Sequence, residues 1–146
     1  MKIEIMNRLM KRIVFLMVSF LVLFMESHAQ DFRNSSQMLI GKMEFDGIVR
    51  DNSNMRIGKI EKDGTIENRN NMMVGKIEKD GSIRDRSNMK IGKVDSDGEV
   101  KDCNNMRIGR VKPDGTVVDR NNMTIGYAKG IPTTYAAVFF FFNIFK

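Results

Sequence analysis

The sequence predicts an all-β fold in which five tandem β-hairpin repeats of seventeen residues form a closed, propeller-like ring. Three observations predict it. A methionine followed three places later by a glycine recurs every seventeen residues, and an Asp-Gly pair separates two short apolar-alternating stretches in each copy. A half copy then ends in a strongly apolar segment. The recurring methionines are Met38, Met55, Met72, Met89, Met106 and Met123.

The first 29 residues have the layout of a secretory signal peptide. A basic head of residues 1–12 precedes an apolar run of residues 13–25, and the small residues Ser27 and Ala29 follow. The run has thirteen residues, whereas a spanning helix needs about 20. We therefore expect cleavage after Ala29 rather than a retained membrane anchor, and an N-terminal signal helix before it.

A linker of residues 30–37 and one repeat domain of residues 38–146 are expected to follow. The copies are predicted at residues 38–54, 55–71, 72–88, 89–105 and 106–122, with a closing unit at residues 123–146.

Each copy carries a hairpin signal, an Asp-Gly pair between apolar stretches. In the fifth copy Pro113 precedes Asp114 and Gly115, which favours a type I turn followed by a glycine bulge. With a three-residue loop of this kind, Ile60 should face Ile66. The equivalent pairs are apolar on both sides, as a buried face requires: Met43 with Val49, Ile77 with Ile83, Val94 with Val100, and Val111 with Val117.

The alternation of apolar residues breaks at the glycine of each copy, as at Gly58. A bulge there would turn Met55, Ile57 and Ile60 inward together. We therefore expect the methionines to form a column in the core, where thioethers fill irregular space. A soft-metal site, such as one for Cu(I), is the alternative. Polar corners such as residues 68–71 would join the hairpins.

The C-terminal segment of residues 135–145 is expected to close the ring. It would pair as a buried strand with the half copy that begins at Met123 and would cover the core. Two alternatives stay open, an open hairpin solenoid in place of a ring and a role for the Phe-rich tail as an interface.

Composition excludes several classes of function. After removal of residues 1–29 the chain has 20 basic and 16 acidic residues and no histidine. This excess of positive charge is small, and the basic residues are mixed with acidic ones along the chain. It therefore does not indicate nucleic-acid binding. The single Cys103 cannot form an intrachain disulfide and is expected in a surface loop. No arrangement of residues indicates catalysis, a cofactor or a metal centre, so we do not expect an enzyme.

Two repeated sets of charged residues are candidate sites. The turn aspartates lack the acidic ligand that a calcium loop needs at its twelfth position, because Met106 stands there. They are better explained by turn chemistry. The other set is a possible anion-binding belt on one face of the ring, otherwise a solvated strand surface: Lys42, Lys59, Lys76, Lys93 and Arg110.

The repeat Met-x-[Ile/Val]-Gly-Lys-[Ile/Val]-x-x-Asp-Gly resembles that of the exported bacterial five-fold β-flower proteins. The matching copies run from Ile40 to Val117, and the ending from Ile125 to Phe140 matches as well. The resemblance implies an all-β ring of five hairpins and no enzymatic activity. The methionine that begins each copy departs from the pattern expected for the family.

Repeat, export signal and resemblance together predict a non-enzymatic structural or interaction module of the bacterial cell envelope. It would be periplasmic, on the cell surface or extracellular, with an unknown protein or glycan partner, no transmembrane span in the mature chain, and oligomerisation open. The alternative is a module that binds an anionic glycan or a lipid headgroup through the belt.

Overall fold

The computed structural model describes residues 1–23 and 30–145. The long N-terminal helix α1 (Lys2–Leu23) covers most of the expected signal peptide. The cleavage site expected after Ala29 lies outside the described residues. Among the helices that the structure describes, none combines the length and the apolarity needed to cross a bilayer.

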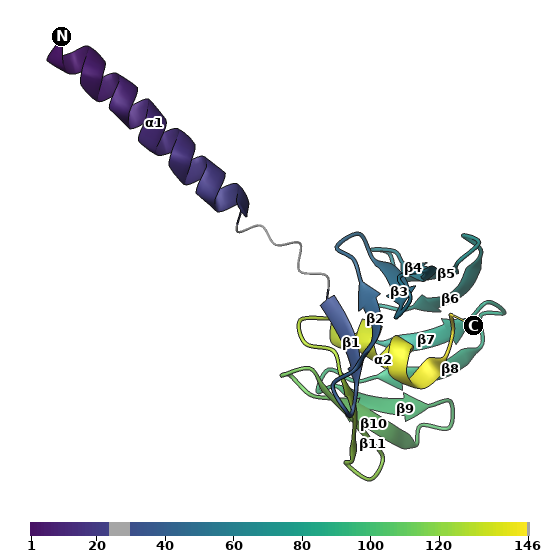
Figure 1. The fold of residues 1–146 in the computed structure, drawn as a ribbon. Coiled ribbons are helices and arrows are strands. Elements are labelled where there is room, and N and C mark those ends of the chain that lie inside the picture. The colour runs from purple at the N-terminus through teal and green to yellow at the C-terminus, as the bar shows by residue number, and fades with distance from the viewer. Residues whose placement is uncertain (24–29, 146) are drawn as a thin grey trace.

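Twelve antiparallel strands form one closed barrel, in which each strand pairs with the next and β1 pairs with β12 (Figure 1). The closed ring is therefore confirmed, and the open solenoid is excluded. The strands are β1 (Gln30–Asn34), β2 (Leu39–Met43), β3 (Ile48–Asp51), β4 (Arg56–Ile60), β5 (Thr65–Asn68), β6 (Met73–Ile77), β7 (Ser82–Asp85), β8 (Lys90–Val94), β9 (Glu99–Asp102), β10 (Arg107–Val111), β11 (Thr116–Asp119) and β12 (Thr124–Tyr127).

The predicted hairpin register is confirmed in all five copies. Ile60 pairs with Ile66, and the four equivalent apolar pairs occur as predicted. At the turn, Gly64 donates its N–H to the carbonyl of Glu61 over 2.9 Å. Gly64 has a φ of 89°, which only glycine adopts without strain. These turns lie at one end of the ring, called here the loop end.

The predicted bulge is also present, but it turns only part of the predicted set inward. Val49 pairs with Gly58 while Arg50 pairs with Arg56, so Ile57 is the extra residue. Ile57 then packs against the core, to which Ile60 also belongs. Ile57 and Ile60 are three positions apart and would lie on opposite faces of a regular strand. The bulge lets both of them face the core.

The predicted methionine column in the core is wrong. Each of the six methionines is more than half exposed, from 56% at Met72 to 65% at Met123. The reason is the corner between hairpins: Asn54 has a φ of 64°, and Met55 accepts the N–H of Asp51 with its carbonyl. This places Met55 in the corner, before β4 begins. The corners define the second end of the ring, called here the corner end.

The predicted linker of residues 30–37 is wrong as well. Residues Gln30–Asn34 form β1, which pairs with β12 on one side and β2 on the other. Phe32 lies opposite Gly41, as Val49 lies opposite Gly58. Gln37 has a φ of 65°, close to the 64° of Asn54 in the equivalent corner. Residues 30–37 are therefore the second half of a sixth unit, whose first half is β12.

The predicted C-terminal closing strand is replaced by a helical plug. The α-helix α2 (Thr133–Ala137) continues into a π-helical segment η1 (Val138–Phe142), and the strands surround them (Figure 1). Ala136, Ala137 and Val138 are fully buried. Because β1 already satisfies the free edge of β12, the apolar segment is left to fill the lumen. Residues 133–145 are called the plug below.

The plug matches the ring one side chain to one unit. A Cβ built on each inward glycine meets a plug side chain, and the apolar plug residues face successive units in order, with Asn143 passed over. An α-helix turns by about 100° per residue, whereas six equal units lie about 60° apart, so a wider helix fits better. The pairs are Phe139 with Gly41, Phe140 with Gly126, Phe141 with Gly109, Phe142 with Gly92, Ile144 with Gly75 and Phe145 with Gly58.

Candidate functional site

The belt predicted from the sequence lies on the outer wall of the ring. Along β4, the buried residues Gly58 and Ile60 flank Lys59, and alternate residues of a strand point to opposite faces. Lys59 therefore points outward. The same position on the other first strands carries Lys42, Lys76, Lys93 and Arg110, so the structure brings all five to one level around the wall.

Carboxylates are interleaved with the belt and neutralise much of it. Lys59 forms an ion pair of 2.7 Å with Glu61, and this hydrogen bond raises the pKa of the Lys59 ammonium. Arg110 lies 3.0 Å from Asp97, and Lys93 lies 3.8 Å from Asp95. Three of the five cations are thus engaged with neighbouring side chains, and the belt is not an uninterrupted ring of free charge.

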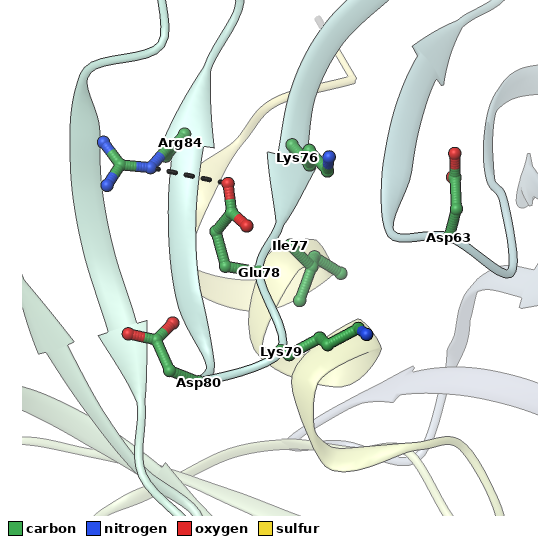
Figure 2. Close-up of a pocket in the computed structure, with 7 residues that line it drawn as sticks. All are labelled: Asp63, Lys76, Ile77, Glu78, Lys79, Asp80 and Arg84. Carbon is green, nitrogen blue, oxygen red and sulfur yellow. Dashed lines mark ion pairs between the residues drawn. The ribbon is translucent and has the colours of Figure 1, made fainter.

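A groove of about 490 Å³ runs beside one belt residue, between two adjacent hairpins. Figure 2 shows Lys76, Glu78 and Lys79 on the third hairpin and Asp63 on the turn of the second. Arg84 lies 3.6 Å from Glu78, as the dashed line indicates. The lining mixes both charges, which suits no single class of small ligand.

The turn aspartates bind the backbone of their own turns. The Asp63 carboxylate accepts the N–H of Thr65 over 2.9 Å, and this hydrogen bond lowers the pKa of Asp63. Asp80 and Asp114 do the same with Ser82 and Thr116, with the same effect on their pKa values. Within residues 1–23 and 30–145, no group of three or more His, Cys, Asp or Glu side chains could hold a metal ion.

The two ends of the ring differ in charge. The corner loops carry Arg69, Arg86 and Arg120. The carboxylates that reach these loops come from the strand ends before them: Asp51, Asp85, Asp102 and Asp119. The segments at the loop end carry four lysines, Lys62, Lys79, Lys112 and Lys129, and nine carboxylates: Glu44, Asp46, Glu61, Asp63, Glu78, Asp80, Asp95, Asp97 and Asp114.

Sequence reasoning missed this polarity because it compared the same position across copies. Comparing the two loops within one copy would have found it, since one holds the Asp-Gly turn and the other the arginines. Cys103 lies in a corner loop and is exposed, as its position in the repeat predicts.

The comparisons with known proteins agree with the ring. A family model described as 5-fold beta-flower protein matches residues 29–144. A search of curated proteins and a search of solved structures found no match. The family match spans β1, all five contiguous hairpins, β12 and most of the plug. The chain belongs to the 5-fold beta-flower family.

Proposed function

We propose that this protein is exported and that its ring is a non-enzymatic interaction module of the cell envelope. The observation that carries the proposal is where the ring begins. Its first strand starts at Gln30, directly after the cleavage site expected at Ala29. Removal of residues 1–29 would therefore leave every strand and the plug intact.

The exposed surface of α1 supports a role in export. Apolar side chains along it are largely exposed, for example Phe15 at 74% and Leu16 at 67%. Such a helix needs an apolar environment that the ring does not supply, and a translocating membrane supplies one.

The filled lumen supports a non-enzymatic role. Enzyme sites are mostly concave pockets with a few convergent polar groups. Here the plug occupies the interior, and Ser82 is the one buried polar residue among the described residues. A ring of this kind offers its outer surfaces and its two ends to partners.

The export proposal is tested by fractionating cells that express the full chain and sequencing the N-terminus of the product. We expect a product outside the cytoplasm that begins at Gln30. A matched Ala29→Lys variant should keep its signal segment, because a long charged side chain does not suit the cleavage site. A cytoplasmic product that retains Met1 in both proteins would contradict the proposal.

The second candidate function is binding of an anionic glycan or lipid headgroup through the belt. The observation that favours it concerns Lys42 and Lys76, which lie on the outer wall and form no ion pair with the described residues. Replacing the five belt cations by glutamine should abolish binding to sulfated glycans, and binding to the parent ring should weaken steeply with salt. Unchanged binding after the replacement would exclude the belt.

A further inference from the structure

We propose that the corner end of the ring is a docking surface for a lipid bilayer with anionic headgroups. The inference deepens the proposed interaction module by naming its partner. Because its test uses purified protein and vesicles, it succeeds or fails independently of export. Three features of the corner end carry it: an apolar rim, an apolar floor and an excess of positive charge.

The rim consists of the six methionines, one at each corner. All are more than half exposed, although an apolar side chain gains free energy when it leaves water. Isolated exposed apolar residues are normal on protein surfaces, but a set gathered at one end marks an interaction site. Methionine is flexible and adapts to an irregular or fluid surface.

The floor consists of the last side chains of the plug. The plug enters the ring from the loop end, where the Thr133 methyl group lies 3.6 Å from a Cβ built on Gly98. It ends at the level of the inward glycines, which are two or three residues from the corners. Phe139 to Phe142, Ile144 and Phe145 are each only half-buried there. Apolar surface therefore extends from the rim toward the ring axis.

The charge of the corner end selects the kind of lipid. Arg69, Arg86 and Arg120 are exposed in the corner loops, and Lys90 is exposed beside Met89. The nearest carboxylates keep their negative charge while they bind the corner backbone. Asp85 accepts the N–H groups of Ser87 and Met89, and Asp51, Asp102 and Asp119 accept the equivalent pairs. Four further guanidinium groups donate to corner carbonyls, so cations outnumber carboxylates at this end: Arg33 to Gln37, Arg50 to Asn54, Arg84 to Asn88 and Arg107 to Arg120.

Cations beside an apolar face are the pattern of proteins that lie on anionic membranes. Basic side chains bind the headgroups while apolar ones enter the boundary of the acyl chains. Long arginine stems can follow the apolar surface and keep their charge at headgroup level. A second copy docked corner to corner would bring like charges together. Among the described residues of the acidic loop end, Phe45 is the one large apolar side chain that is exposed.

The single cysteine provides the reporter. Cys103 is exposed in a corner loop, so a polarity-sensitive fluorophore attached to it senses the surface that faces the bilayer. The experiment uses residues 30–146, which hold the whole closed ring and its plug. Phosphatidylcholine vesicles with and without phosphatidylglycerol are titrated. We expect a blue shift that saturates with the anionic vesicles and stays small with the neutral ones.

A label at the opposite end is the matched control for orientation. In a Cys103→Ser background, Ser96→Cys places the same fluorophore in an exposed turn at the loop end. We expect this label to show no shift while the protein still sediments with the vesicles. Equal shifts from both labels would overturn the proposed orientation.

Two sets of variants separate charge from apolar contact. Arg69, Arg86 and Arg120 replaced by glutamine should weaken vesicle binding about a hundredfold, at roughly fivefold for each cation. The control removes the same charge from the loop end, by glutamine at Lys62, Lys79 and Lys112, and should change binding less than about twofold.

The second set replaces Met55, Met89 and Met106 by glutamine and should weaken binding about tenfold. Its control is Phe45→Gln, which removes a fully exposed aromatic side chain at the loop end. All replaced residues are surface side chains, and circular dichroism checks that each variant keeps its fold.

Three results would overturn the proposal. One is the absence of binding to anionic vesicles, and another is equal loss of binding from the corner and loop variants. The third is a shift of the Cys103 label that grows with protein concentration without vesicles, which would make the corner end an interface between copies of the chain. Binding of the protein to an acidic polypeptide, without binding to anionic vesicles, would also overturn the proposal.

Discussion

At the fourth position of each copy, glycine lets a plug side chain lie directly against the wall of the ring. A Cβ on Gly92 would lie 2.5 Å from the carbonyl oxygen of Lys101 and would also clash with the ring of Phe142. The residue that looks like a strand breaker in the sequence is therefore a packing residue. The same glycine follows the bulge that turns its neighbour inward.

Gly92→Ala should destabilise the ring by about 1–3 kcal/mol, the usual cost of overpacking. Gly75→Ala should cost less, although its Cβ would also lie too close to a carbonyl oxygen, that of Arg84 at 2.7 Å. The difference is the plug side chain, because Ile144 would lie 3.6 Å away, an ordinary contact. Thermal or urea unfolding measures both. Adding Phe142→Ile to Gly92→Ala should recover part of the loss, since it imitates the pair at Gly75. Equal stability of the parent and Gly92→Ala would contradict the packing described.

The methionines lie at the corners and not in the core because of the backbone conformation of the residue before each of them. The sequence pattern places Met55 at the parity of Ile57, and an alternating strand would put both inward. In the structure β4 begins only at Arg56, one residue after Met55, because Asn54 takes a left-handed conformation. The Asp51 carboxylate accepts hydrogen bonds from the N–H groups of Ser53 and Met55, and these bonds fix the corner. The polar residues between the hairpins predict a corner, but they do not show how far the corner extends toward the strand.

Acid should destabilise the ring through the turn aspartates. The pKa values of Asp63, Asp80 and Asp114 are lowered from 3.8 in the fold by the backbone hydrogen bonds of their turns. A lowered pKa gives stability that is present above the unfolded value and lost as pH falls through the folded one. The melting temperature should therefore fall below about pH 4.

Replacing these three aspartates by asparagine should flatten that fall. Asparagine keeps an oxygen that accepts the same N–H but does not titrate. Melting curves of the parent and the triple variant from neutral to acid pH compare the two. If both fall equally, the turns do not cause the acid sensitivity.

At the scale of elements, the hairpins could be predicted and the plug could not. Each copy contains its own turn and both of its strands, so the apolar pairs test the register within seventeen residues. The plug has no partner in its own sequence neighbourhood, and a short apolar run reads equally as a buried strand or a buried helix. The alignment of Phe139 to Phe145 with six distant glycines is a property of the closed ring.

Deletion of residues 136–146 should unfold or strongly destabilise the ring. It removes Val138 and the aromatic side chains from the lumen, including Phe139, whose ring stacks on Phe32 at 3.8 Å between centroids. Loss of one large core side chain alone costs about 3–5 kcal/mol. Circular dichroism and the melting temperature report the loss, and a synthetic peptide of the deleted residues should restore part of the fold. A truncated ring that melts like the parent would show that the plug is not part of the core.

At the scale of the whole molecule, the sixth unit joins the two ends of the repeat domain. Its strands β12 and β1 lie at least ninety positions apart in the sequence, at residues 124–127 and 30–34. The chain is therefore a permuted array of six units, in which one unit is split between the ends. This arrangement leaves no free strand edge in the ring, and free edges are the sites where sheets aggregate.

The sequence does contain a trace of the split unit. Phe32, Asn34 and Gln37 stand seventeen residues before Val49, Asp51 and Asn54, and each occupies the equivalent place in the structure. β1 reads as a linker in the sequence because it has neither the methionine nor the glycine that marks a copy. A search for the second half of the repeat, rather than the first, would have found it.

The most direct test of the account is a disulfide across the seam between β1 and β12. Arg33 and Tyr127 are partners in the register, so cysteines at both positions, with Cys103→Ser, lie within reach of a disulfide. Mild oxidation of the folded protein should give an intrachain disulfide in the monomer. The control pair Arg33→Cys and Ser87→Cys, with Ser87 in the distant corner between β7 and β8, should give none. A folded, monomeric Arg33→Cys, Tyr127→Cys variant that forms no intrachain disulfide would contradict the closed ring.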